Sequence, residues 1–124
     1  MKVARLIARI LLGLIFTVFG LNGFLHFLPM PPMSGPPADF FAAMFKTGYM
    51  LNLIFGAQVI GGVLVLAGVF VPLGLAILAP VIVNIFFFHL HLDPSGLPLA
   101  LIVVILELFM AWSYRDKFAP LFSS

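Results

Sequence analysis

The chain has 124 residues, of which 64% are apolar and 8% are charged, whereas soluble domains carry about 25% charged residues. A net charge of +2 leaves no extended basic surface for nucleic acid. The absence of cysteine excludes thiolate catalysis, iron–sulfur clusters and cysteine-based zinc sites. Because so few charges cannot cover a water-soluble surface, the composition predicts a single integral membrane domain over residues 1–124.

The first apolar stretch predicts a membrane span over about residues 6–28, close to the ~20 residues that a ~30 Å hydrocarbon core requires. Its basic start resembles a secretory signal, but no cleavage site of small residues follows, so we expect a retained helix. Five prolines then end this helix. Residues 39–46 predict a short interfacial helix with Asp39 as N-cap, Gly48 as stop, and an apolar face made by Phe40, Phe41, Met44 and Phe45.

Three further apolar stretches predict membrane spans over about residues 49–70, 72–92 and 98–114. Pro80 lies inside the third span, where it removes the hydrogen bond to the carbonyl of Ala76 and favours a kink. The tail after Arg115 predicts one more short amphipathic piece. The expected fold is all-α: an integral membrane four-helix bundle with a short interfacial helix between helices 1 and 2.

Basic residues are concentrated near the two chain termini. Only Lys46 lies on the other side of the predicted membrane, and the remaining five are Lys2, Arg5, Arg9, Arg115 and Lys117. By the positive-inside rule we expect both termini to be cytoplasmic and the proline-rich loop to face outward.

Each predicted span carries one polar side chain at a similar depth, and the four are Asn22, Gln58, Asn84 and Glu107. From the ~1.5 Å rise per residue they lie ~9–13 Å below the outer helix ends. Because a buried carboxyl or amide is costly unless paired, they predict a shared internal site. We expect Glu107 to be a protonated acid that either bonds Gln58 or Asn84, or serves as a proton relay or ligand group.

Histidines lie closer to the predicted outer mouth. His26 follows Asn22 by four residues, so the two share a helix face, and His26 is expected at the rim of a pocket that reaches Glu107. His89 and His91 point in nearly opposite directions, so one should face the cavity and the other the headgroups. The aromatic run at residues 86–88 is interpreted mainly as lipid contact, with the wall of a pocket for a flat ring as the open alternative.

These groups are suited to a quinone headgroup, a proton or a metal ion. Metal is the weakest choice, because H-x-H on a helix does not easily direct both rings to one ion and H-E-x-x-H is absent. We assign no metal ligand and no catalytic residue. The candidate ligand-binding residues are Glu107, Asn22, His26, Gln58, Asn84 and His89.

A series of different short motifs runs along nearly the whole chain in a characteristic order and spacing. They are residues 18–24 with His26 and Pro29, Gly61-Gly62, residues 70–73, Ala79-Pro80, residues 83–85, His89, residues 93–98, and residues 107–109 leading to 114–116. In this order the chain resembles the DoxX family, in its DoxX-like branch of small four-span bacterial membrane proteins. The resemblance implies a four-helix bundle in the bacterial cytoplasmic (inner) membrane.

Relatives in that family are tied to quinone-linked oxidation of sulfur compounds, to membrane oxidoreductase complexes and to receptor assembly. Similar proteins often carry a basic residue where this chain has Gly23, and a glutamate where it has Gln58. If those charges serve catalysis elsewhere, either this chain lacks that catalysis or Glu107 carries the acid alone.

The chain has no dinucleotide fingerprint or nucleotide-binding loop, so independent catalysis is not expected. We expect an accessory subunit of a membrane redox or stress-response complex, with an outward-opening polar pocket for a small lipophilic ligand such as a quinone. Its expected partners are the lipid bilayer and an oxidoreductase, and a homo-oligomer stays open. The alternatives are a small-molecule or proton-coupled transporter and a non-catalytic membrane assembly factor.

Overall fold

The structure of the protein, a computed structural model, describes residues 2–26 and 34–122. Within these residues every regular element is helical, and four helices are long and apolar enough to cross a membrane. The four are α1 (Lys2–Leu25), α3 (Met50–Ala67), α4 (Val71–His91) and α5 (Leu97–Ser113). The predicted all-α membrane bundle is therefore confirmed.

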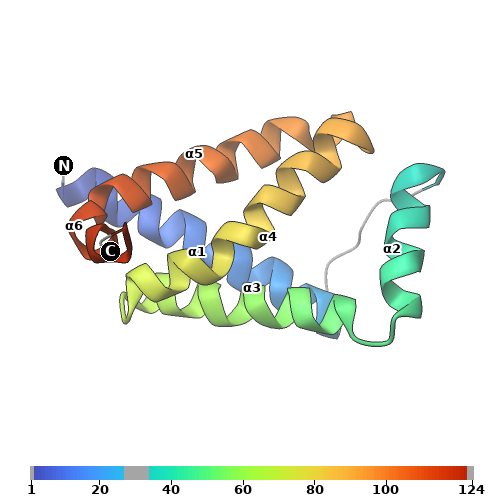
Figure 1. Ribbon diagram of the computed structural model, residues 1–124, viewed down its shortest axis with the longest axis horizontal. Coiled ribbons are helices and arrows are strands. Elements are labelled where there is room, and N and C mark those ends of the chain that lie inside the picture. The colour runs from blue at the N-terminus through green and yellow to red at the C-terminus, as the bar shows by residue number, and fades with distance from the viewer. Residues whose placement is uncertain (1, 27–33, 123–124) are drawn as a thin grey trace.

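The four long helices pack in chain order, and α1 also contacts α5 to close the bundle (Figure 1). Both chain ends lie at one end of the bundle beside the short helix α6 (Arg115–Phe118), which we call the terminal end. The short helix α2 (Pro36–Lys46) stands across the opposite end, which we call the α2 end. The membrane face that each end meets stays a prediction.

The first helix is displaced from its predicted bounds. It begins at Lys2 and ends at Leu25, because His26 takes a left-handed conformation (φ 53°) that ends the helix. The His26 N–H still donates to the carbonyl of Asn22 at 2.8 Å. The last two residues of the predicted span, at 27 and 28, lie outside the described residues.

The short helix α2 begins three residues earlier than predicted. Gly35 is its N-cap, so the assignment of Asp39 as N-cap is wrong, and Asp39 lies in the first turn. The cause is Pro36, whose fixed φ suits the first helical position. Gly48 has a φ of 82°, which agrees with its expected role at the end of this helix.

The C-terminal half follows the predicted elements closely. Asp93 precedes a short 3-10 turn, η1 (Pro94–Gly96), that leads directly into α5. The amphipathic tail forms α6 and a final turn, η2 (Ala119–Phe122). Pro80 lies inside α4, and the kink expected there stays a prediction.

Small residues bring α1 and α3 together. A Cβ added at Gly13 would lie 2.5 Å from the backbone nitrogen of Leu66, and one at Gly62 would lie 2.6 Å from that of Thr17. The two backbones are therefore in direct contact, which is the packing role expected of these glycines. Arg9 adds a polar link, since its Nη1 donates to the carbonyls of Val65 and Leu66, each at 3.1 Å.

Candidate functional site

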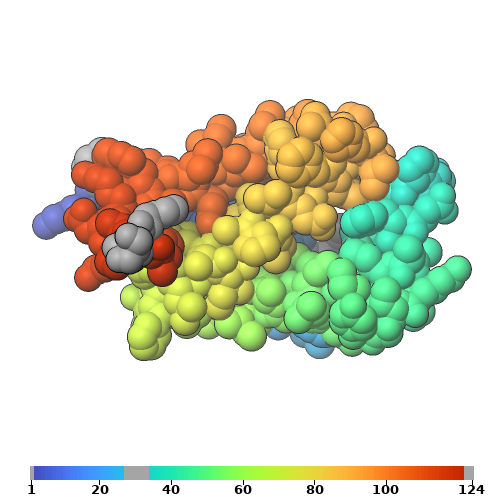
Figure 2. All heavy atoms as spheres, viewed as in Figure 1, coloured from blue at the N-terminus to red at the C-terminus, as the bar shows by residue number. Residues whose placement is uncertain are grey.

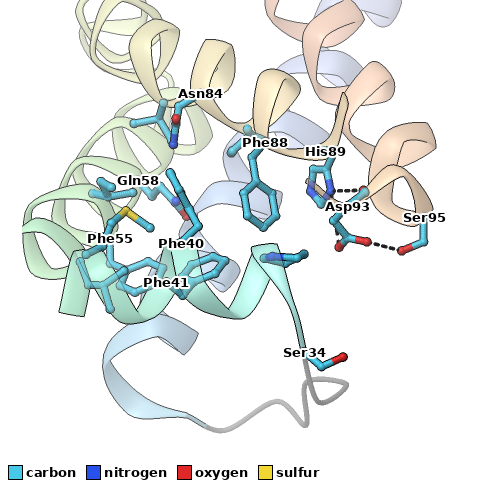
Figure 3. A pocket seen from close by; sticks show the side chains of 16 residues that line it. Ser34, Phe40, Phe41, Phe55, Gln58, Asn84, Phe88, His89, Asp93 and Ser95 are labelled. Atoms are coloured by element: carbon cyan, nitrogen blue, oxygen red, sulfur yellow. Dashed lines mark hydrogen bonds and ion pairs between the residues drawn. The ribbon is translucent and has the colours of Figure 1, made fainter. Parts of the chain in front are cut away.

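A cavity of about 440 Å³ lies between α2, α3 and α4, and we call it the α2-end pocket (Figures 2 and 3). Its volume is within the range of about 300–1,000 Å³ that small-molecule sites occupy. Figure 2 shows the surface hollowed where α2 meets α4. The lining residues named in the argument below are Phe40, Phe41, Phe55, Gln58, Asn84, Phe88, His89, Asp93 and Ser95.

Aromatic rings make the walls of the α2-end pocket. The rings of Phe40 and Phe41 on α2 each lie 5.3 Å from the ring of Phe88 on α4, measured between centroids. The apolar face of α2 therefore holds this helix against the bundle. Of the three phenylalanines in the run beside the histidines, Phe88 lines the pocket, and the binding of a flat ring there stays a prediction.

A fourth ring, that of Phe55, occupies the space beside Gly23. Phe55 on α3 lies so close to Gly23 that any Cβ added at Gly23 would overlap its ring. Phe55 also packs edge-on against Phe24, with 6.1 Å between centroids. The space beside the α1 backbone at position 23 is therefore filled by a ring that lines the pocket.

Polar groups reach the same pocket from two helices. Gln58 of α3 is buried, and Asn84 of α4 is open to the space that Phe40 borders (Figure 3). Carboxamides both donate and accept hydrogen bonds, so they orient a polar ligand without adding charge. The structure thus brings together three of the six predicted residues: Gln58, Asn84 and His89.

The turn before α5 fixes the His89 ring. His89 Nδ1 lies 3.1 Å from the carbonyl oxygen of Asp93, and since a carbonyl only accepts, Nδ1 is the nitrogen that carries the proton. The Asp93 carboxylate lies 3.8 Å from the same nitrogen and accepts a hydrogen bond from Ser95 Oγ at 2.6 Å (Figure 3). Nε2 is therefore the ring nitrogen left to meet a ligand.

Gly96 and His91 complete the surroundings of this histidine. A Cβ at Gly96 would overlap the His89 ring, so the glycine leaves the space that the ring occupies. His91 is exposed and stacks on Phe87, with 6.0 Å between centroids and an interplanar angle of 15°. The expectation that only one of the two histidines faces the cavity is confirmed, and the one that does so is His89.

Glu107 lies in a different cavity. This open space of about 410 Å³, which we call the terminal-end pocket, is bordered by α4, α5, α6 and η2. Glu107 is 9% exposed, and its Oε1 is buried without a hydrogen-bond partner among the described residues. The walls around it are Leu75, Ala76, Ala79, Ala111, Arg115, Phe118, Ala119 and Leu121.

The two pockets lie on opposite faces of α4. Val81 and Ile85 line the α2-end pocket, whereas Leu75 and Ala79 line the terminal-end pocket. At 3.6 residues per turn these two pairs point about 120° apart, and the mean directions of all the α4 residues that line the two pockets are about 160° apart. The prediction of one internal site shared by four polar residues is therefore wrong for Glu107, because similar depth does not fix the direction in which a helix presents a side chain.

Two predicted residues line neither pocket. Asn22 is buried on α1, and His26 is exposed just beyond the end of that helix. The prediction that His26 and Glu107 border one cavity is wrong, since Glu107 lines the terminal-end pocket and His26 lines neither pocket. His89 takes the place at the mouth of the α2-end pocket that was expected for His26.

Sequence reasoning missed Arg115 as a neighbour of Glu107. The four-residue spacing of Glu107 and Ala111 places these two on one helical face, but Arg115 begins α6 beyond the end of α5 at Ser113, so the spacing does not place it there. Sequence reasoning also did not predict what the apolar face of α2 packs against. In the structure Phe40 and Phe41 pack against Phe88.

The described residues hold no group of three or more histidine, cysteine, aspartate or glutamate side chains arranged to bind a metal ion. The side chains that line the two pockets offer hydrogen bonds, aromatic contact and proton exchange. Comparisons with protein-family models, with curated proteins and with solved structures find no match to this chain.

Proposed function

We propose that this chain is a DoxX-like accessory subunit of a membrane redox or stress-response complex, and that its α2-end pocket binds a quinone headgroup. The observation that supports the proposal is the combination of aromatic walls with amide and imidazole groups in one cavity of suitable size. A quinone headgroup is a flat ring with carbonyl oxygens on opposite edges, so it needs both kinds of surface.

The residues have complementary roles in this proposal. Phe40 and Phe88 stack against or border the ring, and the carboxamides of Gln58 and Asn84 donate N–H bonds to its carbonyl oxygens. His89 Nε2 accepts a proton from the reduced, hydroxyl form and returns it to the oxidised form. Asp93 holds the imidazole in the orientation that this exchange requires.

An accessory role follows from the groups that the pocket provides. Its side chains position a headgroup and exchange protons, whereas the electrons are exchanged with a partner oxidoreductase. We do not propose transport, because the two cavities lie on opposite faces of α4 and do not form one path across the bundle.

Native mass spectrometry of the protein in lipid nanodiscs tests the proposal with decylubiquinone and a short-chain naphthoquinone as probes. We expect one bound quinone, and about three- to tenfold weaker binding in Gln58→Leu and in His89→Phe, since each loses a hydrogen bond. Asn52→Leu and His91→Phe are matched controls, because both residues are exposed and lie outside the pocket lining. The proposal fails if no quinone binds, or if the controls weaken binding as much as the pocket variants.

A further inference from the structure

The terminal-end pocket has no part in the proposed quinone site. It lies at the other end of the bundle and on the other face of α4, and its walls come from different residues. Its volume of about 410 Å³ is nevertheless similar to that of the α2-end pocket. Alanines at positions 76, 79 and 111 make much of the space, since larger side chains there would fill it.

One polar group inside this apolar pocket lacks a partner. Glu107 is nine-tenths buried, it lines the pocket, and Oε1 has no hydrogen bond among the described residues. Buried carboxyl oxygens in folded proteins are almost always paired, because an unpaired one has lost its water and gained nothing. A molecule that enters the pocket and meets the carboxyl would supply the missing partner.

The charges around the pocket limit what that molecule is. Arg115 is the basic residue in the lining, so a cationic ligand is disfavoured. Its guanidinium already donates to the carbonyl of Trp112 at 2.9 Å and lies over the Trp112 ring, 4.4 Å from the centroid. Trp112, three residues earlier, thus holds the Arg115 guanidinium, and an anionic ligand would also meet the Glu107 carboxyl.

A hydroxyl group satisfies the carboxyl in either orientation. If Oε1 is the carbonyl oxygen of the acid it needs a donor, and if it carries the proton it needs an acceptor; a hydroxyl is both. We propose that the terminal-end pocket binds an uncharged lipophilic alcohol, whose hydroxyl bonds Glu107 and whose hydrocarbon chain lies against the alanine, leucine and phenylalanine walls. A free alkanol and a neutral lipid such as a diacylglycerol share this chemistry.

Photolabelling tests the proposal on the whole chain in nanodiscs, with an octanol that carries an aliphatic diazirine as the probe. We expect a saturable adduct that peptide mapping places on the lining residues at positions 107–121, and that excess 1-octanol prevents. Octane should compete about fivefold less well than 1-octanol at equal concentration in the membrane, which is the effect of one net hydrogen bond. Dioctanoylglycerol as competitor separates the two sources: stronger competition than octanol identifies a neutral lipid, and weaker competition identifies a free alcohol.

Variants of the pocket lining show whether the octanol probe binds in the terminal-end pocket. In Glu107→Leu the difference between octanol and octane should disappear, and Ala79→Leu should abolish the adduct by filling the pocket. Ala67→Leu is the matched control, because it adds the same volume at an exposed position outside the lining. Equal competition by octane and octanol in the unmodified chain would overturn the proposal, as would an adduct that persists in Ala79→Leu. The octanol and octane comparison needs no variant, so it decides the matter even where a variant fails to fold.

Discussion

The two pockets of this bundle contain buried polar groups under opposite conditions. In the α2-end pocket the His89 ring is held by Asp93, which is itself bonded by Ser95. In the terminal-end pocket the Glu107 carboxyl has an oxygen with no such support among the described residues. In our two proposals, the first site is organised before a ligand arrives, whereas a ligand completes the second. Substitutions in the two pockets should therefore change stability with opposite signs.

The largest expected effect concerns which pocket opens to which side of the membrane. The chain has no cysteine, so single cysteines can report on each end without a background. Lys46→Cys at the α2 end should react with a membrane-impermeant maleimide in intact cells, and Lys117→Cys at the terminal end should react only after lysis. The reverse labelling pattern would place the α2-end pocket on the cytoplasmic side.

A substitution at Glu107 tests the account of the terminal-end pocket. In delipidated detergent, Glu107→Leu should raise the free energy of unfolding by about 1–3 kcal/mol, because it removes a buried oxygen that has no partner. Glu107→Gln should stay near the unmodified chain, since an amide in that position is also unpaired. Denaturant or thermal unfolding measures both. Destabilisation by Glu107→Leu would mean that the carboxyl is paired within the protein.

A substitution at Gly96 tests the account of the α2-end pocket, in which Asp93 holds the His89 ring. Gly96→Ala places a methyl group where the His89 ring lies, so the ring must move away from Asp93. We expect stability to fall by about 1–3 kcal/mol through overpacking, together with weaker quinone binding. Gly56→Ala is a suitable control, because an added Cβ there meets nothing within 4 Å. Equal behaviour of the two variants would contradict the role assigned to Gly96.

The smallest loss of stability in the α2-end pocket should come from a substitution at Ser95. Ser95→Ala removes the 2.6 Å hydrogen bond to Asp93 but leaves the contact between Asp93 and His89 in place. Stability should fall by about 0.5–1.5 kcal/mol, the net value of one hydrogen bond. Because Ser95 is exposed, the lower end of this range is expected. A loss larger than that of Gly96→Ala would reverse the proposed order of support around His89.

The sequence was sufficient for the parts of the fold that depend on one segment at a time. The four spans follow from the length of each apolar stretch, and the opposite directions of His89 and His91 follow from helical periodicity alone. The separation of Gln58 and Glu107 into two pockets could not be predicted in this way. It depends on which face of α5 meets α4. That face is set by packing among all four long helices, including the contact of α5 with α1, which is far from it in the sequence.

The ends of segments were the other source of error. The left-handed turn at His26 ends α1 before the expected residue, and Pro36 starts α2 earlier than Asp39. Histidine can adopt a left-handed conformation, but a histidine in a sequence does not predict one, whereas a glycine often does. As a result, the predicted face shared by Asn22 and His26 does not continue to the mouth of a pocket.

The separation of the two pockets is tested most directly by a double-mutant cycle between Gln58→Leu and Glu107→Leu. Unfolding free energies of the unmodified chain, both single variants and the double variant give the coupling between the two side chains. Because the residues line different cavities on opposite faces of α4, we predict that the effects add to within about 0.5 kcal/mol. A coupling energy of about 1 kcal/mol or more would show that Gln58 and Glu107 belong to one hydrogen-bonded network, and would contradict the account of two independent sites.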